Sequence, residues 1–560
     1  MILTKRPRYG ATLLLAGWLA GTGILRAADS SNADDIATLK AQIAAQQKQL
    51  EALESAISDQ QKLLERIAAN QPAPTPMLRS ARLGEVTSLT PIIPQAPAIP
   101  TLPVTAAAQK EGSGGNPCEG GPDGNSVPPY LRLGNTCIQP IGFMDFTAVW
   151  RDKDAGSSIG SNFGSIPFNN AAASKLSEFR FSPQNSRIGF RIDGRWKGAH
   201  FIGYNEFDFL SSATPTSSGV SNGAAVPRLR LYWVDVRKGK LEVLGGQSWT
   251  MLAPNRSGIS ALPADLFYSQ VIDVNYMLGL TWTRQPGARI LYHPSDKVTM
   301  GVSFENPNQY IGGSAGGAGI TLPSAAALSG IAGSQLDNSS GGFLSTPNVM
   351  PDIIAKVAFD PTSKVHFEVA GILREFKIWD SAGNAYSSTT GRGGAINGNF
   401  EVAKGFRLIT NNFYGAGGGR YLFGQAPDVV VRSDGTLQTV NSAGFVEGFE
   451  LAHKNWLWYA YYGDVFIGRA ALLDANGKTP IGYGYTGSPN SQNRNIQEIT
   501  FGFNQTLWRD SRYGAINFMG QYEYLLRDPW YVVLGAPKGT HDNTIYFNLR
   551  YSLPGSMPKF

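Results

Sequence analysis

The feature that most constrains this chain is a series of sixteen short segments between residues 139 and 553, in which polar and apolar residues alternate. Such alternation places successive side chains on opposite faces of a β-sheet. An even number of strands lets an antiparallel sheet close with both chain ends on one side. The predicted strands are 139–151, 176–195, 199–211, 227–237, 241–252, 277–293, 297–307, 350–360, 365–379, 393–404, 406–420, 442–454, 456–468, 494–508, 514–528 and 542–553. The chain is therefore predicted to be an all-β transmembrane antiparallel barrel of about sixteen strands.

The connections between these segments alternate strictly between short and long. Short turns include 238–240 and the single residue Asn455. The long loops include 152–175, 253–276, 308–349, 421–441 and 469–493. Barrels of bacterial outer membranes have short turns on the periplasmic side and long loops outside. A soluble β-sandwich is not expected to show this asymmetry, so the pattern favours a barrel in the outer membrane of a Gram-negative cell.

The two faces of a predicted strand also differ in chemistry. In the second strand Ile188, Phe190 and Ile192 share one face, whereas Arg187 and Arg191 share the other. A soluble barrel turns its apolar face inward, but a membrane barrel turns it toward lipid and keeps a polar lumen. We therefore expect the isoleucine and phenylalanine side chains to face lipid and the arginines to face water.

The chain is divided into four regions before and within the barrel. Residues 1–28 combine a basic start, an apolar stretch and small residues, which is typical of a cleaved signal peptide. Residues 29–70 contain an apolar heptad repeat that predicts an α-helical coiled coil, with a single helix packed on the barrel as the alternative. Residues 71–137, rich in Pro, Ala and Gly, predict a linker and a periplasmic entry segment. Residues 138–560 form the predicted outer-membrane barrel.

The basic charge of the chain depends largely on the signal peptide. The formal net charge is +6, and removal of Lys5, Arg6, Arg8 and Arg26 with the signal leaves about +2. So small an excess is not typical of a nucleic-acid-binding protein. No nucleic-acid partner is therefore expected.

The chain has two cysteines, Cys118 and Cys137, just before the first predicted strand. Disulfides form in exported proteins, which are exposed to an oxidising compartment. The spacing therefore predicts a disulfide that closes a short periplasmic loop. A pair of free thiols is the alternative.

Charged residues on the early strands are the candidate pore lining. They are Arg180, Arg187 and Arg191 on the second strand, Glu206 and Asp208 on the third, and Arg228 and Arg230 on the fourth. Guanidinium groups stay charged at all working pH values and bind carboxylates through two parallel hydrogen bonds. This set therefore favours anions. Because the two acids balance part of the charge, a mixed and weakly selective pore remains the alternative.

The third long loop, residues 253–276, mixes charged and apolar residues. Arg256 and Asp273 lie among apolar side chains suited to packing against the barrel wall. We expect this loop to fold into the lumen and narrow it, with Arg256 at the pore. An ordinary surface loop is the alternative.

An enzymatic function has little support in the sequence. The five histidines show no metal-ligand spacing, and no nucleophile motif of the G-x-S-x-G type occurs. The glycine-rich stretch 312–319 lies in a long loop without a following helix, so it is interpreted as loop rather than as a phosphate cradle. No catalytic residue, metal or cofactor is predicted.

Three further features carry a resemblance to a known family. They are PQNSRIGFRIDG at 183–194, GGQSWTMLAP at 245–254 and the terminal Phe560. Together with the coiled coil, linker and barrel, they resemble the DcaP-like family of trimeric outer-membrane porins. The chain departs from the family pattern in its long Pro-rich spacer, its cysteine pair, and Pro554 and Pro558 near the end.

The resemblance implies a homotrimer held through barrel and coiled coil, with the barrel in outer-membrane lipid and the coil in the periplasm. It also implies passage of small anionic solutes such as dicarboxylates, with Arg187 and Arg191 lining the lumen and Gln247 near its narrowest part. A phosphate-selective porin, a weakly selective general porin and an outer-membrane hydrolase are the alternatives.

Overall fold

The computed structural model describes residues 131–212, 225–267, 269–312, 319–324, 335–336, 349–380, 384–510 and 512–554. The predicted signal peptide and coiled coil, and the predicted linker up to residue 130, lie outside these ranges. Phe560 lies outside them as well. No helix in the described part of the chain is long and apolar enough to cross a bilayer.

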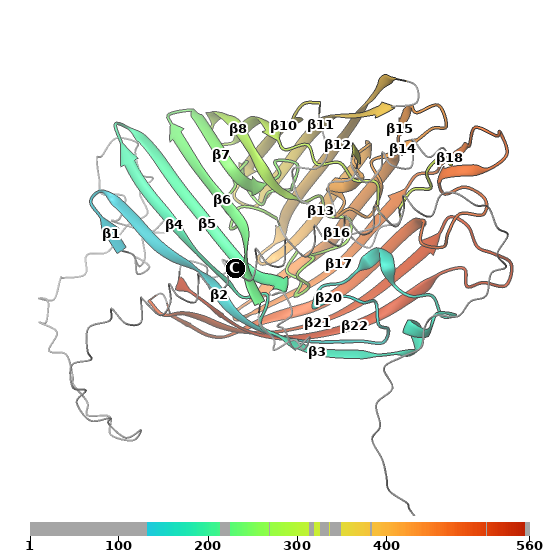
Figure 1. Cartoon of the computed structure of the whole chain (residues 1–560). Helices are drawn as coiled ribbons and strands as arrows, with labels where there is room; N and C mark the ends of the chain where they lie inside the picture. The colour runs from blue at the N-terminus through green and yellow to red at the C-terminus, as the bar shows by residue number, and fades with distance from the viewer. Residues whose placement is uncertain are drawn as a thin grey trace, which may run out of the picture. The chain divides into compact units, whose positions relative to one another are not determined.

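The described chain forms one continuous antiparallel wall with sixteen strand positions (Figure 1). The first eight positions are β2 (Thr136–Arg151), β3 with β4 (Glu178–Ser182 and Arg187–Trp196), β5 (Ala199–Ser212), β6 (Ala225–Lys238), β7 (Leu241–Trp249), β8 (Arg284–Ser295), β9 (Val298–Glu305) and β10 (Asp352–Thr362). The remaining eight are β11 (Val365–Asp380), β12 (Ala385–Ala403), β13 (Phe406–Ala416), β16 (Asn441–His453), β17 (Trp456–Ile467), β20 (Asn493–Asp510), β21 (Gly514–Pro529) and β22 (Thr540–Ser552).

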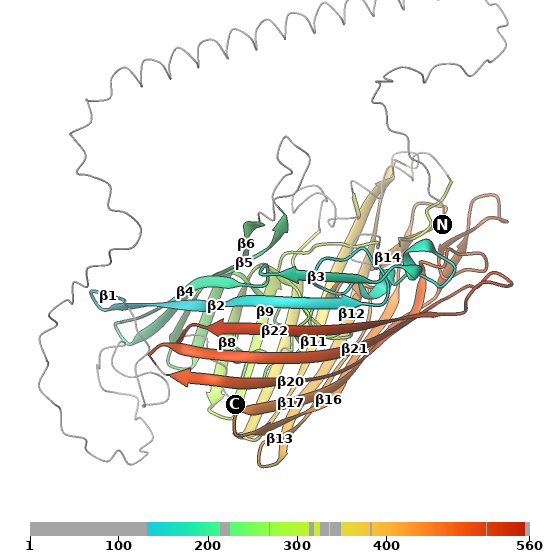
Figure 2. The same ribbon diagram turned by 90° about the horizontal axis from the view of Figure 1, so that it is seen from below.

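The wall closes where its first and last strands meet. β2 pairs with β22 from Phe143 opposite Ser552 to Arg151 opposite Thr544. Figure 2 shows β2 and β22 side by side, with β21 and β20 next in order. The predicted closed antiparallel barrel of sixteen strands is therefore confirmed.

Further short strands are present besides the sixteen positions of the wall. β1 (Leu131–Leu133) forms a hairpin with the start of β2. In the long loops, β14 (Val429–Val431) pairs with β15 (Leu437–Thr439), and β18 (Ala470–Leu473) pairs with β19 (Pro480–Tyr483). The long loops thus carry structure of their own.

The second strand position, predicted as one strand over 176–195, is divided between Ser182 and Arg187. β2 pairs with β3 through Thr147–Ser182 and with β4 through Phe143–Arg187. Pro183 has no N–H to donate to a ladder. The Ser186 hydroxyl accepts the N–H of Asp145 at 2.9 Å, so the break leaves this donor satisfied.

The start of β8 differs from the prediction. The strand was expected from residue 277 but begins at Arg284. Residues 277–283 make bonds inside the barrel instead: the Leu278 N–H donates to Glu498 at 2.8 Å, and Trp282 forms a bridge with Leu422. Residues 277–283 form an apolar run. Such a run has the same sequence pattern whether it is buried inside the lumen or buried in a sheet, so the sequence predicts a strand here.

The two faces of the wall are reversed relative to a soluble protein. The outward side chains of β4 are exposed, with Ile188 at 52% and Phe190 at 42%. Exposed apolar side chains recur around the wall; they include Met144, Phe146, Val234, Val243, Ile290, Val302, Phe501, Phe547 and Leu549. Charged side chains are buried on the inside; they include Arg151, Glu206, Asp208, Lys356, Glu368, Arg374, Glu498 and Glu523. This arrangement suits a wall that contacts lipid outside and polar groups inside.

Candidate functional site

The connection between β7 and β8 folds into the barrel. Leu252 and Leu278 in this loop are fully buried. Its backbone N–H groups donate to inward side chains of distant strands, including Asn255 to Glu368 at 3.3 Å and Leu278 to Glu498 at 2.8 Å. The prediction that residues 253–276 fold into the lumen is therefore confirmed, and the inward segment extends over 250–283.

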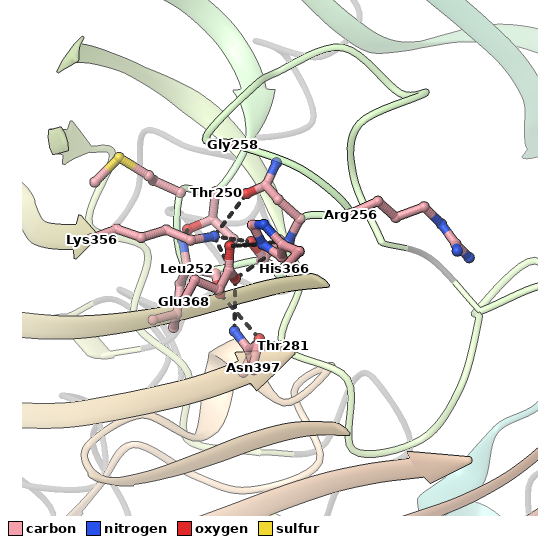
Figure 3. Close-up of polar contacts among 12 residues, drawn as sticks. Thr250, Leu252, Arg256, Gly258, Thr281, Lys356, His366, Glu368 and Asn397 are labelled. Atoms are coloured by element: carbon pink, nitrogen blue, oxygen red, sulfur yellow. Dashed lines mark hydrogen bonds and ion pairs between the residues drawn. The ribbon is translucent and has the colours of Figure 1, made fainter. Parts of the chain in front are cut away.

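A buried ion pair holds the first part of this loop against the wall. Lys356 of β10 lies 2.7 Å from Glu368 of β11, and neither side chain is exposed. The Lys356 ammonium also donates to the Ala253 carbonyl and the Asn255 side chain, both at 2.8 Å. Figure 3 shows Lys356 and Glu368 converging on the loop, while Arg256 points away from them. Each charge thus has hydrogen-bond partners, which a buried ion needs.

Arginine and acid side chains form a network on the inner wall of β5 and β6. Arg230 donates to Glu206 and to Asp208, both at 2.7 Å. Arg228 binds the same Asp208 at 2.8 Å. The structure therefore brings together four of the sequence-predicted charged residues.

A β-bulge at Arg230 turns Leu231 inward. Glu206 pairs with Leu231 and the next residue, Phe207, pairs with Leu229, so Arg230 is the extra residue. Simple alternation would put Leu231 on the outer face with the exposed Leu229, but Leu231 is fully buried. Bulges commonly re-aim a side chain in this way.

Gln247 supports this bulge from the outer side. It pairs with Tyr232, which is exposed on the outer face. Its amide donates to the carbonyl of Arg230 at 2.9 Å. The expectation that Gln247 lines the lumen is therefore wrong, because a residue paired across a ladder shares its partner's face.

Tyr276 connects the loop to this network. Its hydroxyl accepts hydrogen bonds from Arg187 at 3.2 Å and from Arg230 at 3.0 Å. Its backbone φ of +61° lies in the left-handed region, which is uncommon for a residue with a side chain. Burial alone would raise the pKa of this hydroxyl, but Arg187, Arg230 and Arg284 lower the pKa to about 8. The loop thus places a titratable group among arginines.

Phe143 of β2 lies between two arginines. The guanidinium of Arg187 is 5.0 Å from the ring centre, and that of Arg550 is 4.1 Å from it. Arg550 also binds Asp145 at 2.7 Å. Sequence reasoning missed Phe143, Asp145 and Arg550, although all three occupy inward positions of the first and last strands.

Two ion pairs of the inner wall share an asymmetry. The Arg228 side chain is 42% exposed and its partner Asp208 is 0% exposed. Arg550 is 22% exposed and its partner Asp145 is 0% exposed. Each pair presents the guanidinium to water and covers the carboxylate.

The remaining predicted residues occupy separate places. Arg180 binds Glu178 at 2.8 Å, and Arg191 binds Asp193 at 2.7 Å. Arg256 binds Glu450 at 2.7 Å and lies 4.9 Å from the centre of the Phe267 ring. These three arginines therefore lie on the inner wall or the inward loop, outside the network around Arg230.

Cys137, buried at the start of β2, is disulfide-bonded. The chain's other cysteine, Cys118, lies outside the described residues, so this pairing stays a prediction. Within the described ranges, no group of three or more His, Cys, Asp or Glu side chains is arranged to hold a metal ion.

Comparison with known proteins places the fold. No protein-family model and no curated protein matches the chain. The crystal structure of the outer membrane channel DcaP of Acinetobacter baumannii is similar, with a TM-score of 0.54 and 17% identity over 74% of this chain and 97% of that chain. OmpF of Salmonella typhi in complex with daunomycin gives a TM-score of 0.41 and 10% identity over 76% of this chain and 99% of that chain. The likeness to DcaP shows that the two chains share a fold, as the sequence resemblance predicted.

Proposed function

We propose that this protein is an outer-membrane porin, a water-filled channel for the passive diffusion of small hydrophilic solutes. Anions such as dicarboxylates are its favoured solutes. The proposal places the barrel in the outer membrane of a Gram-negative cell, as a homotrimer with the N-terminal coiled coil in the periplasm.

The distribution of polarity supports a channel in a membrane. Apolar side chains cover the outer wall, and charged side chains cover the inner wall. A sixteen-stranded barrel is wide enough to enclose an aqueous lumen. The inward loop 250–283 then narrows this lumen. The fold shared with the DcaP channel agrees with this function.

The exposure of guanidinium groups over covered carboxylates carries the anion preference. A solute in the lumen meets Arg228 and Arg550 before it meets Asp208 and Asp145. Charges of one sign in a confined channel raise the local concentration of ions of the opposite sign. The net field along the exposed wall is therefore positive, and anions enter more readily than cations.

The alternatives fit the described residues less well. A lysine-rich constriction would favour a phosphate-selective porin, but Lys356 beside the loop is buried and paired with Glu368. A hydrolase needs a nucleophile activated by a base. None of the described histidines hydrogen-bonds a serine.

Reversal potentials in a potassium chloride gradient test the proposal. The purified full chain in a planar bilayer should show a chloride-to-potassium permeability ratio above one. Replacing Arg187 and Arg191 together by Ala should lower this ratio, because two lumen charges are lost. Phe190→Ala, on the lipid side between them, is the matched control and should leave the ratio unchanged. Failure to conduct, or a preference for potassium in the parent, would refute the proposal.

A further inference from the structure

Arg284 differs from the other arginines near the inward loop. It lies at the start of β8, directly after the loop. Its Nη1 atom is buried and donates to no described atom. No ion pair joins Arg284 to a carboxylate among the described residues; its guanidinium carbon lies over the Trp249 ring, 5.3 Å from the ring centre.

The surroundings of Arg284 do not neutralise it. Arg228, Arg230, Tyr276 and Asp208 are within electrostatic range. Both acids of this region are already bound to arginines, Glu206 to Arg230 and Asp208 to both Arg228 and Arg230. Guanidinium groups therefore outnumber carboxylates in this region, and Arg284 is left without a carboxylate partner among the described residues.

An uncompensated charge in a partly buried place is unfavourable for folding. Removing an ion from water costs several kcal/mol unless a counter-charge or hydrogen bonds replace the water. An unpaired buried charge of this kind is typical of a site where a ligand supplies the missing partner. Such a site is kept for its function although it lowers stability. The charge excess therefore points to an anion.

The geometry suits an oxyanion. The flat Trp249 ring supports the guanidinium from one side, an arrangement in which cation and aromatic face attract each other. This contact leaves Nη1 without a hydrogen-bond partner among the described residues. The edges of a guanidinium match the two oxygens of a carboxylate or phosphate. Arg228, 42% exposed, is close enough to interact electrostatically with Arg284.

We propose that Arg284, with Arg228 and Tyr276 beside it, forms a binding site for a small oxyanion at the base of the inward loop. The site rests on the proposed function, since it gives an anion-preferring channel a discrete place where a carboxylate or phosphate stops. The ring of Trp249 orients Arg284, and Arg228 attracts the anion from the lumen.

Block of chloride current tests the site. Sodium succinate or inorganic phosphate is added to the full chain in a phospholipid bilayer without lipopolysaccharide, and the half-blocking concentration is measured. Arg284→Gln should raise this concentration about tenfold, the effect of losing one charge-assisted interaction. Arg284→Lys should raise it by less, because it keeps the charge but loses the paired N–H edges. Arg494→Gln removes a charge outside the candidate pore lining that has its own acid, Asp528, and should change it less than about twofold.

A stability measurement separates binding from a structural role. Without added anion, Arg284→Gln should leave the urea unfolding midpoint unchanged or raise it, since it removes an unpaired charge. Succinate should raise the midpoint of the parent but not that of Arg284→Gln. Equal block of parent and both Arg284 variants would overturn the site, as would a lower midpoint in Arg284→Gln without anion. If the parent still prefers chloride in that case, the proposed function stands and only the site fails.

Discussion

The guanidinium of Arg550 lies 4.1 Å from the centre of the Phe143 ring, and β22 thereby contributes a positive charge to the inner wall of β2. Arg187 lies against the same ring at 5.0 Å. Two like charges are thus held close together, both attracted to one aromatic ring. Each is also near a carboxylate: Arg550 is near Asp145, and Arg187 is near Glu206, which it shares with Arg230.

Phe143→Leu should lower the chloride-to-potassium permeability ratio, because it keeps apolar volume but removes the ring that positions both guanidinium groups. Phe143→Trp should retain the ratio, since indole is the strongest aromatic partner for a cation. Reversal potentials measure both. Phe146→Leu, on the outer face of the same strand, is the control. An unchanged ratio in Phe143→Leu would contradict a positioning role.

The pKa of Tyr276, lowered to about 8, predicts a pH dependence of selectivity. As the pH rises through this value the hydroxyl loses its proton and a negative charge forms beside Arg187 and Arg230. The anion preference should therefore fall between pH of about 7 and about 9, below the range where an ordinary tyrosine with a pKa of ~10 titrates. Tyr276→Phe should abolish this dependence, and Tyr232→Phe on the outer face should keep it. A parent ratio that stays constant over this range would contradict the prediction.

Lys356→Met should lower the free energy of unfolding by ~3–5 kcal/mol, because it leaves the carboxylate of Glu368 buried without its counter-charge. Urea titration of the heat-modifiable folded band on a gel measures this loss. The second change Glu368→Gln, added to Lys356→Met, should restore part of it by removing the unpaired charge. Lys364→Met, in an exposed turn, should have little effect. Equal stability of Lys356→Met and the parent would argue against the loop anchor.

Cys137 should be linked to Cys118 in the exported protein, since Cys137 is disulfide-bonded and the chain has no third cysteine. Mass spectrometry of non-reduced peptides should recover the two in one cross-linked species. Recovery of both as alkylated thiols from unreduced protein would refute the pairing.

The alternation of polar and apolar residues was sufficient to predict the strands of the wall, because residues two positions apart in a strand lie on the same face of the sheet. The exposed faces of Ile188 and Phe190 follow directly from this alternation. The bulge at Arg230 was not predicted, since an extra residue in one strand is defined only by the register of the next strand. Gln247 shows the opposite case: alternation from the buried Leu244 places it outward, and only the family resemblance suggested the lumen.

The candidate site was harder to predict than the wall. Its members are far apart in sequence. The inward loop brings Tyr276 to Arg187, and barrel closure brings Arg550 to Phe143. No spacing in a single sequence encodes such contacts. The constriction loop itself was predicted from its mixed composition, but its end was not, since residues 277–283 are as apolar as a strand.

The inward loop also bears on the rigidity of the barrel. It is held by Glu368, Glu450 and Glu498, which lie on β11, β16 and β20. It also reaches the seam between β2 and β22, where the Tyr546 hydroxyl of β22 donates to Asp273 of the loop at 3.1 Å. The loop is thus a cross-brace between strands on distant parts of the wall. The part of the chain that narrows the channel therefore also resists deformation of the sheet around it.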